Sequence, residues 1–499
     1  MTSSSKAKSL LRLNRPFNQN IVVGCVLFLT PGIYLALTGL GAGGGRPSSQ
    51  DVASTTNAIL YGLFTLFGWA GGSILNLLGP RLTLATGCIG YPLYVGSLWY
   101  FDRVGNKWFP YFGGAILGVT AGILWTTAGF VQFAYATETE KAKFITWQWA
   151  LTCFGGTVGS FIAFGCNFHQ TAATGVSTPV YIVFIVLMLC AIAISLIFVI
   201  DPRKVVRDDG THIAIFKQAH VWTEIKGVFS CFMDLNIIIM LPAIFVGEMN
   251  LALMSSINCM STPYYFNLRT RSLNNVMFQF IEIPVPLALA YIMDCEKIKS
   301  RRLRGMLGLG IMGVITMGTN AGLATWIVKN DINQNHTSPA ADWTSDAFGA
   351  GFILYLLSGI IYAGYQIVVQ WVISALTNDP VRCARYSGMY KGTTSLGMCI
   401  SFVLDSKTVP YIDQLIVQFV IYGVGLCCVF CIIWFRVKET NYFAEDDVIV
   451  PHKFAERALI EGIAAREQVE KEELKERIAE GDIEVKDSAV IIREANERV

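Results

Sequence analysis

The sequence has few charged residues for its length. Asp, Glu, Lys and Arg together make up 15% of its 499 residues, whereas hydrophobic residues make up 53%. A soluble domain needs about a quarter charged residues to hydrate its surface. The shortage excludes a pair of soluble domains and places most of the chain in a lipid bilayer. No basic stretch with interleaved aromatic residues is present, so nucleic acid is not an expected partner.

Several functional signals are also missing. The 13 cysteines show neither metal-ligand spacing nor a disulfide framework, and many lie inside apolar runs. The glycine-rich stretch 41–45 lacks the Lys-Ser/Thr of a phosphate-binding loop. Residues 1–16 lack the apolar core and cleavage site of a secretory signal, so the first span is expected to direct insertion. We therefore expect no cofactor, no metal and no enzymatic activity.

Long apolar runs are abundant and fall into two series. A helix needs about 20 apolar residues to cross a bilayer, and the two series are separated by a polar interruption at 201–233. The pattern predicts an all-α polytopic membrane protein with 12 transmembrane helices in two six-helix halves. The predicted spans are 17–40, 53–78, 82–100, 109–136, 144–165 and 178–200, then 235–262, 273–293, 305–328, 347–376, 387–405 and 412–435.

The same pattern gives the domain organisation. We expect a cytoplasmic N-terminal tail at 1–16, halves at 17–200 and 234–436, a central cytoplasmic loop at 201–233 and a charged cytoplasmic tail at 437–499. The tail is rich in Glu and Lys, as is typical of a solvated segment.

Basic residues predict the orientation of the chain. The connections expected to be cytoplasmic contain 20 Lys and Arg, with Lys391 at the start of the eleventh span counted among them, and the opposite connections contain 7. Because basic residues concentrate on the cytoplasmic side, both termini should be cytoplasmic. The sequon at Asn335 then lies outside as a candidate glycosylation site. The membrane is predicted to be the plasma membrane or an endomembrane.

A short basic turn joins the second and third spans. Gly72, Asn76, Gly79 and Arg81 have the spacing of the turn between helices 2 and 3 in major facilitator transporters, and the chain resembles that superfamily. The superfamily usually has aspartate where this chain has Asn76. We therefore expect Asn76 to supply a neutral hydrogen bond, and Arg81 to bond to acceptors at neighbouring helix ends.

More of the chain resembles the uncoordinated-93-like branch in its fungal form. The resemblance implies the 12-helix fold, and it spans most of residues 17–436. It is found in Asn76–Arg81, Gly90 and Tyr91 with Tyr94, Gly122–Trp125, Asn267–Arg271 with Leu273–Asn275, and Arg385 and Tyr386 with Tyr390–Gly392.

Two acids are expected inside the membrane. Glu248 follows Asp234 by 14 residues, and Glu282 precedes Asp294 by 12. These separations place them roughly 21 Å and 18 Å from the same side, near the midplane. A buried carboxylate is costly in hydrocarbon, so such acids usually face a polar cavity. Glu248 and Glu282 are candidates for proton coupling; the alternative is a structural hydrogen-bonding role.

Aromatic and amide side chains form a second candidate set. They suit a solute with an apolar body and a few hydrogen-bonding groups. Glutamine also holds membrane helices together, so packing is the alternative role. The candidates for a substrate cavity are Trp125, Gln132, Gln148, Gln279, Gln366 and Gln370.

Two classes of function fit these features. The leading interpretation is a secondary transporter of a small molecule that alternates access around a midplane cavity, with protons as candidate coupling ions. The alternative is a membrane accessory or trafficking protein that regulates a channel or receptor, as the resemblance to animal members implies. The two acids and the duplicated halves favour transport, whereas Asn76 in the turn favours the accessory role.

Overall fold

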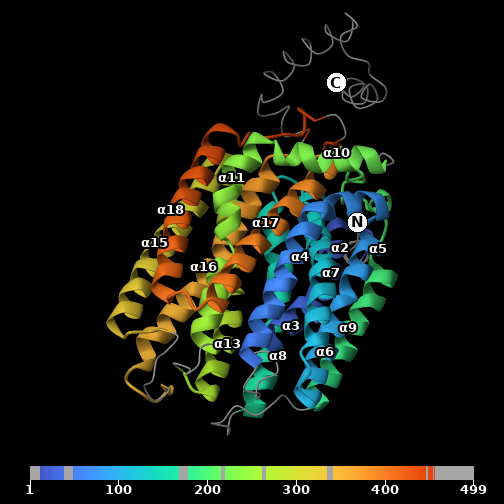
Figure 1. Cartoon of the computed structure of the whole chain (residues 1–499). Coiled ribbons are helices and arrows are strands. Elements are labelled where there is room, and N and C mark those ends of the chain that lie inside the picture. Colours follow the sequence, from blue (N-terminus) through green and yellow to red (C-terminus); the bar gives the residue numbers. More distant parts are fainter. Residues whose placement is uncertain are drawn as a thin grey trace, which may run out of the picture.

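The fold is a bundle of long helices that run roughly side by side (Figure 1). The structure is a computed structural model, and it describes residues 12–38, 49–167, 178–214, 220–260, 266–333, 341–445, 448–452 and 455. Within these ranges, strand pairing is limited to three isolated bridges. Asn335 lies outside the described residues.

Helices of the first half follow the predicted spans closely. Proline begins α2 and α5, where its missing N–H costs nothing. Pro31 breaks the first span and produces a π-helical turn between two α-helical pieces. The elements are α2 (Pro16–Leu27), η1 (Phe28–Gly32), α3 (Ile33–Thr38), α4 (Ser49–Leu78), α5 (Pro80–Cys88), α6 (Gly90–Val104), α7 (Trp108–Ala134), α8 (Lys141–Asn167) and α9 (Thr178–Phe198).

The central connection and the second half are also helical. Side chains of Asp234, Asn267, Ser300 and Asp379 cap the helices that follow them. The elements are η2 (Pro202–Lys204), α10 (Val221–Phe232), α11 (Leu235–Val246), α12 (Met249–Ser255), η3 (Ser256–Met260), α13 (Leu268–Ile281), α14 (Pro284–Met293), α15 (Arg301–Lys329), α16 (Phe348–Ala375), α17 (Pro380–Ser406) and α18 (Tyr411–Phe435).

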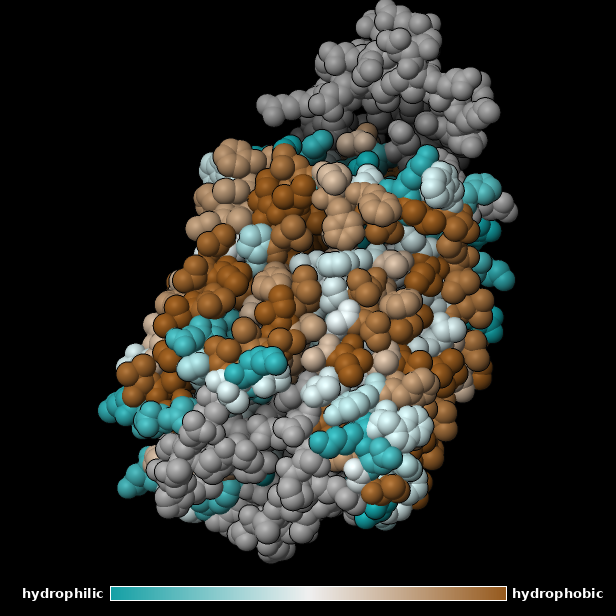
Figure 2. All heavy atoms as spheres, in the orientation of Figure 1, coloured by the Kyte–Doolittle hydropathy of each residue, from teal (hydrophilic) through white to brown (hydrophobic). Residues whose placement is uncertain are grey.

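The surface is that of a membrane protein. Figure 2 shows apolar side chains over much of the visible flank and hydrophilic ones gathered towards both ends. In the described ranges, nine helices are long and apolar enough to cross a bilayer. The other predicted spans lie on α5 with α6, on α8 and on α17, which are helical but more polar. Most of α17 is buried in the bundle, where polar side chains avoid lipid.

Both ends of the described chain lie at one end of the bundle, which we call the termini end. Arg15 binds Asp208 through its guanidinium group, and His452 donates its backbone N–H to Asp209. Helix α10 lies across this end (Figure 1). The residues 201–233, expected as a polar loop, thus include a short 3-10 helix and a surface α-helix.

Candidate functional site

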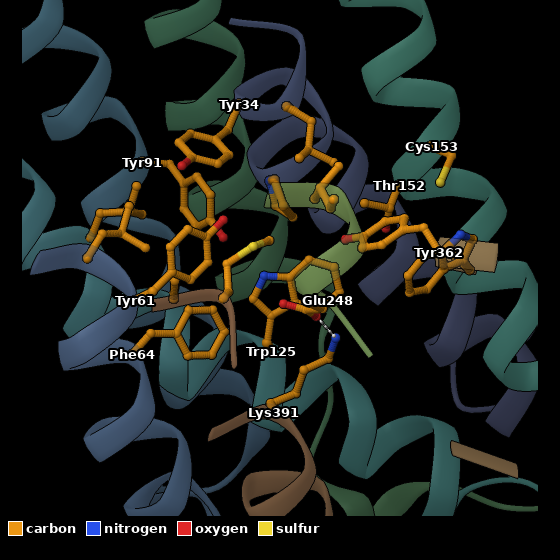
Figure 3. Close-up of a pocket in the computed structure, with 18 of the residues that line it drawn as sticks. Tyr34, Tyr61, Phe64, Tyr91, Trp125, Thr152, Cys153, Glu248, Tyr362 and Lys391 are labelled. Atoms are coloured by element: carbon orange, nitrogen blue, oxygen red, sulfur yellow. Dashed lines mark hydrogen bonds and ion pairs between the residues drawn. The ribbon is translucent and has the colours of Figure 1, made fainter. Parts of the chain in front are cut away.

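A cavity lies inside the bundle, and helices of both halves line it. It contains roughly 670 Å³ of empty space, including the open space at its mouth. Figure 3 shows aromatic side chains on one side, Cys153 and Tyr362 on the other, and Glu248 with Lys391 between them. The aromatic lining residues are Tyr34, Tyr61, Phe64, Tyr91, Trp125, Trp149 and Tyr362, and the charged ones are Glu248, Glu282 and Lys391.

Helix breaks place both acids at the cavity. Glu248 lies between α11 and α12, and Glu282 lies between α13 and α14, just before Pro284. Pro31, in the irregular turn of the first span, lines the same cavity. Interrupted helices that meet in a membrane bundle are typical of transporter binding sites, because their free backbone groups face a cavity instead of lipid.

Glu248 forms an ion pair with a lysine that sequence analysis assigned elsewhere. Lys391 Nζ lies 3.3 Å from Glu248 Oε1, and the side chains are only 6% and 10% exposed. The ammonium group also lies 4.4 Å from the ring centroid of Trp125 and 6.0 Å from that of Trp149. Lys391 and Glu248 come from the second half and both tryptophans from the first. The cation therefore contacts an aromatic wall across the boundary between the halves.

Glu282 has a different partner. The thiol of Cys153 donates to Oε2 of Glu282 over 3.2 Å, which joins α8 of the first half to the break in the second. Glu282 is fully buried, and its Oε1 has no hydrogen-bond partner among the described residues. This carboxyl group can therefore accept or donate one further hydrogen bond at the cavity wall.

The predicted amides lie outside the lining of this cavity. Gln132 donates to Gln148 over 2.9 Å, and Gln148 donates to Asn20 over 2.6 Å, so this chain of amides joins α7, α8 and α2. Gln366 accepts from the hydroxyl of Tyr390 over 2.8 Å. These three glutamines hold helices together, which is the packing alternative.

The other two glutamines are buried beside the site. Gln279 packs against Gly156 of α8, and Gln370 lies on α16 with its Nε2 unpaired among the described residues. Trp125 is the only residue of the predicted cavity set that lines the cavity.

Lys391 is the residue that sequence analysis missed. It is counted with the basic connection although it lies inside the predicted span 387–405, and α17, which begins at Pro380, carries it three turns into the bundle. Without Lys391, the connections expected to be cytoplasmic contain 19 Lys and Arg, and the opposite connections contain 7. The signal that could have found it is a lone lysine between Tyr390 and Gly392 within a helical stretch.

The turn after α4 is built as its glycines require. Gly79 has φ +77°, which favours glycine, and Pro80 begins α5 directly after it. A Cβ on Gly72 would lie 2.6 Å from the carbonyl oxygen of Ala384, so α4 and α17 approach closely there. Arg81 is exposed, and among the described residues it forms no hydrogen bond or ion pair. The expected bonds from Arg81 to neighbouring helix ends are therefore wrong, because its side chain points to the surface.

Asn76 does form a hydrogen bond, but its acceptor is charged. Asn76 Nδ2 donates to Glu224 Oε2 over 3.0 Å, and Arg385 Nη2 lies 3.0 Å from Glu224 Oε1. Glu224 belongs to α10 and Arg385 to α17. A carboxylate from the central connection thus lies against the turn, next to the position where the superfamily has aspartate.

A second polar network joins the halves at the termini end. Lys141, at the start of α8, donates to the carbonyl oxygens of Ser374 and Thr377 at the end of α16. Glu138 pairs with the buried Arg301 at the start of α15, with 3.3 Å between Oε1 and Nη1. These contacts close the bundle between the cavity and the termini end.

The fold and the interrupted helices define a polytopic membrane protein of the major facilitator type. The fucose:proton symporter FucP of Escherichia coli matches with a TM-score of 0.57 at 13% identity, covering 84% of this chain and 98% of the symporter. The proton:xylose symporter XylE matches with a TM-score of 0.56 at 13% identity, covering 84% and 94%. These likenesses show the fold.

The chain belongs to the UNC-93 family. The model of that family, described as ion channel regulatory protein UNC-93, matches residues 52–308. An uncharacterized membrane protein of Schizosaccharomyces pombe is 46% identical over 81% of this chain and 81% of its own length. UNC93-like protein 1 of Arabidopsis thaliana is 33% identical over 86% of this chain and 92% of its own length. The family and the fold are those of non-enzymatic, multi-pass membrane proteins.

Proposed function

We propose that the protein is a proton-coupled secondary transporter of a small organic solute. The observation that carries the proposal is the Glu248–Lys391 ion pair, which lies at a helix break and faces tryptophans of the other half. The halves 17–200 and 234–436 would rock about the cavity, with both termini in the cytoplasm. The tails 1–16 and 437–499 and the connection 201–233 would lie on that side.

The ion pair supplies a coupling step. While Glu248 is ionised, it holds the ammonium group of Lys391 by charge attraction. When Glu248 takes up a proton, Lys391 loses its counter-charge and becomes available to an anionic or hydrogen-bond-accepting group of a solute. Proton and solute then occupy the cavity together, which is the requirement for symport.

The cavity wall describes the solute. Seven aromatic rings would contact an apolar or aromatic body, Lys391 would take a carboxylate, and Glu282 would take one further hydrogen bond. Because Cys153 and Glu282 belong to different halves, their hydrogen bond would break when the halves part. FucP and XylE are proton symporters, which agrees with the proposal although those proteins share only the fold with this chain.

The test uses the full chain in proteoliposomes, and solute uptake is measured by mass spectrometry of the vesicle contents. A panel of aromatic and aliphatic carboxylates, each with its matched neutral amide, is applied with and without an inward proton gradient. We expect uptake of carboxylates and not of their amides, because one proton and one carboxylate cross together without net charge. Glu248→Gln should lose acceleration by the gradient but keep counterflow exchange, and Lys391→Gln should lose both. Asp413→Asn, at an exposed site on α18, is the matched control. Unchanged gradient dependence in both cavity variants would refute the proposal.

The second candidate is the accessory role, favoured by the description of the family as ion channel regulatory proteins. Under this hypothesis the Glu248–Lys391 pair is structural. Proteoliposomes would then take up no member of the panel, and co-expression with a channel would change the channel current equally for the parent protein and for Glu248→Gln.

A further inference from the structure

Helix α10 differs from the other long helices because it lies across the termini end of the bundle (Figure 1). It packs against α4, α11 and α17. Its side chains have three kinds of surroundings, and each kind occupies its own sector of the helix.

The first sector faces the bundle. Glu224, Gly227 and Cys231 are buried. Glu224 receives hydrogen bonds from Asn76 and Arg385. A Cβ on Gly227 would lie 2.5 Å from Nε of Arg385, so glycine lets the guanidinium group lie against the helix.

The second sector is apolar and exposed. Val221, Trp222, Ile225 and Phe229 are 60%, 65%, 41% and 67% exposed. The third sector is polar and exposed, and contains Thr223, Lys226 and Ser230.

The order of the three sectors around α10 indicates what the helix lies against. At about 100° per residue, the buried sector is followed by the apolar sector and then by the polar sector. A surface helix of a soluble protein has a buried and a polar side only. An apolar sector set between protein and water is what a helix presents when it lies along the boundary of a bilayer, beside the bundle.

The apolar sector also continues onto a membrane-facing surface. Met233, Leu235 and Ile238 are 78%, 52% and 42% exposed and lead from the end of α10 onto α11, which is long and apolar enough, with α12, to span a bilayer. Lys226 lies with its Nζ 5.6 Å from the ring centroid of Trp222, at the border of the apolar and polar sectors. From there its ammonium group can reach lipid headgroups while its stem covers the ring.

We propose that α10 is docked in the interfacial layer of the bilayer, with Val221, Trp222, Ile225 and Phe229 at the boundary between headgroups and acyl chains. Glu224, on its bundle-facing side, then ties this lipid-held helix to α4 through Asn76 and to α17 through Arg385. Lipid becomes a structural partner of the contact between the two halves.

The test places a fluorescent noncanonical amino acid at single positions of the full chain in nanodiscs, which leaves the native cysteines unchanged. The label replaces Phe229 in one sample and Thr223 in the other, since both sites are exposed and lie on one helix. Quenching is measured with iodide in water and with lipids brominated near the headgroup. We expect the label at 229 to be quenched at least threefold more by brominated lipid than the label at 223, and the label at 223 more by iodide.

Two results would overturn the proposal. Equal quenching of both labels by iodide would place the apolar sector in water. Protection of the label at 229 from both quenchers would mean that a protein surface covers it. As a second measurement, the label is placed at Ile225 with Trp222→Ser and Phe229→Ser together. Lipid quenching at 225 should fall by at least half, whereas Ser230→Ala should leave it unchanged; no loss with the double variant would also contradict docking.

Discussion

At the scale of single residues, the central feature is a pair of opposite charges kept away from bulk water. A lone buried charge is destabilising because desolvation is not offset, whereas a paired one can be tolerated. Glu248 and Lys391 satisfy this requirement with each other. The pair also has a third participant, since the ring of Trp125 lies 4.4 Å from the ammonium group.

Charge pairing makes a prediction about stability. Lys391→Met and Glu248→Gln should each lower the free energy of unfolding in detergent by about 3 kcal/mol. This value is at the lower end of the cost of breaking a buried ion pair, because this pair lines a cavity. The double variant should lose less stability than the sum of the two single losses, since no uncompensated charge remains. Thermal unfolding of all four proteins measures the coupling. Strict additivity would show that the two side chains do not form a functional pair.

Sequence reasoning found part of the candidate site for an identifiable reason. Helix rise alone placed Glu248 and Glu282 at a common depth, and both line the cavity. It could not say which polar groups meet. Gln132 and Gln148 bond to each other, and Lys391 faces Glu248 from a helix distant in sequence. These pairings depend on the rotation of each helix about its axis, which composition does not determine.

At the scale of helices, close packing of α4 against α17 joins the halves. A Cβ on Gly68 would lie 2.7 Å from Cα of Gly392, and one on Gly388 would lie 2.6 Å from the carbonyl oxygen of Gly68. With Gly72 opposite Ala384, small residues line the contact on both helices. Without a hydrophobic driving force between helices in lipid, such close approach is a main source of packing energy.

Close packing predicts an asymmetry between glycine substitutions. Gly72→Ala should destabilise the fold and weaken the contact between the halves, because its methyl group would meet backbone atoms that cannot move aside. Gly310→Ala, on α15, has open space around the added Cβ and should stabilise by about 0.5–1 kcal/mol through helix propensity. Thermal stability of the two variants provides the comparison. A Gly72→Ala protein as stable as the parent would contradict the geometry.

The Asn76–Glu224–Arg385 network makes a second prediction at this scale. Asn76→Asp would place a carboxylate where an amide now donates to Glu224 over 3.0 Å, so like charges would repel and the termini end should open more often. Adding Glu224→Gln restores a donor and should reverse the shift. Accessibility of the cavity to a membrane-impermeant reagent from each side measures the balance. The idea fails if Asn76→Asp and the double variant behave alike.

The predicted spans and the helices agree because length and composition are strong signals. In the described part of the chain, each predicted span lies mostly on helix. The breaks at Glu248 and before Pro284 were not predicted as breaks, since an apolar run reads the same whether the helix is continuous or interrupted. Helix α10 was missed because its apolar sector is short and polar residues surround it.

At the scale of the whole molecule, a segment after α18 crosses the termini end. Glu439 accepts from the backbone N–H of Arg301, and Asn441 donates its backbone N–H to Glu138. Further along, Ile449 accepts from Arg207, which belongs to the connection after the first half. This strap, residues 439–445 and 448–452, therefore contacts both halves on the same face as the Lys141 and Glu138 network.

Asp294 lies in this closed end and makes it sensitive to pH. Its carboxylate accepts from the backbone N–H groups of Ala142 and Lys143, over 3.1 and 2.7 Å, and so joins the end of α14 to the first turn of α8. Burial raises the pKa of Asp294 to about 7, although these two N–H groups and the charge of Arg304 lower it; Glu140 raises it further. Opening the termini end would expose the carboxyl group to water and return its pKa towards the ordinary value near 4.

The sign of the pH effect follows from linkage. Between about pH 4 and 7 the closed form holds more protons at Asp294 than the open form, so raising the pH through this range should favour opening. For one proton, the ratio of open to closed form should rise by up to about tenfold per pH unit. Energy transfer between dyes at Arg203, in the connection directly after the first half, and Arg436, at the end of the second half, reports the opening in nanodiscs; both residues are exposed. Asp294→Asn cannot titrate and should flatten the response in this range, whereas Asp413→Asn should leave it unchanged. A response that persists in Asp294→Asn would assign the pH dependence to another group.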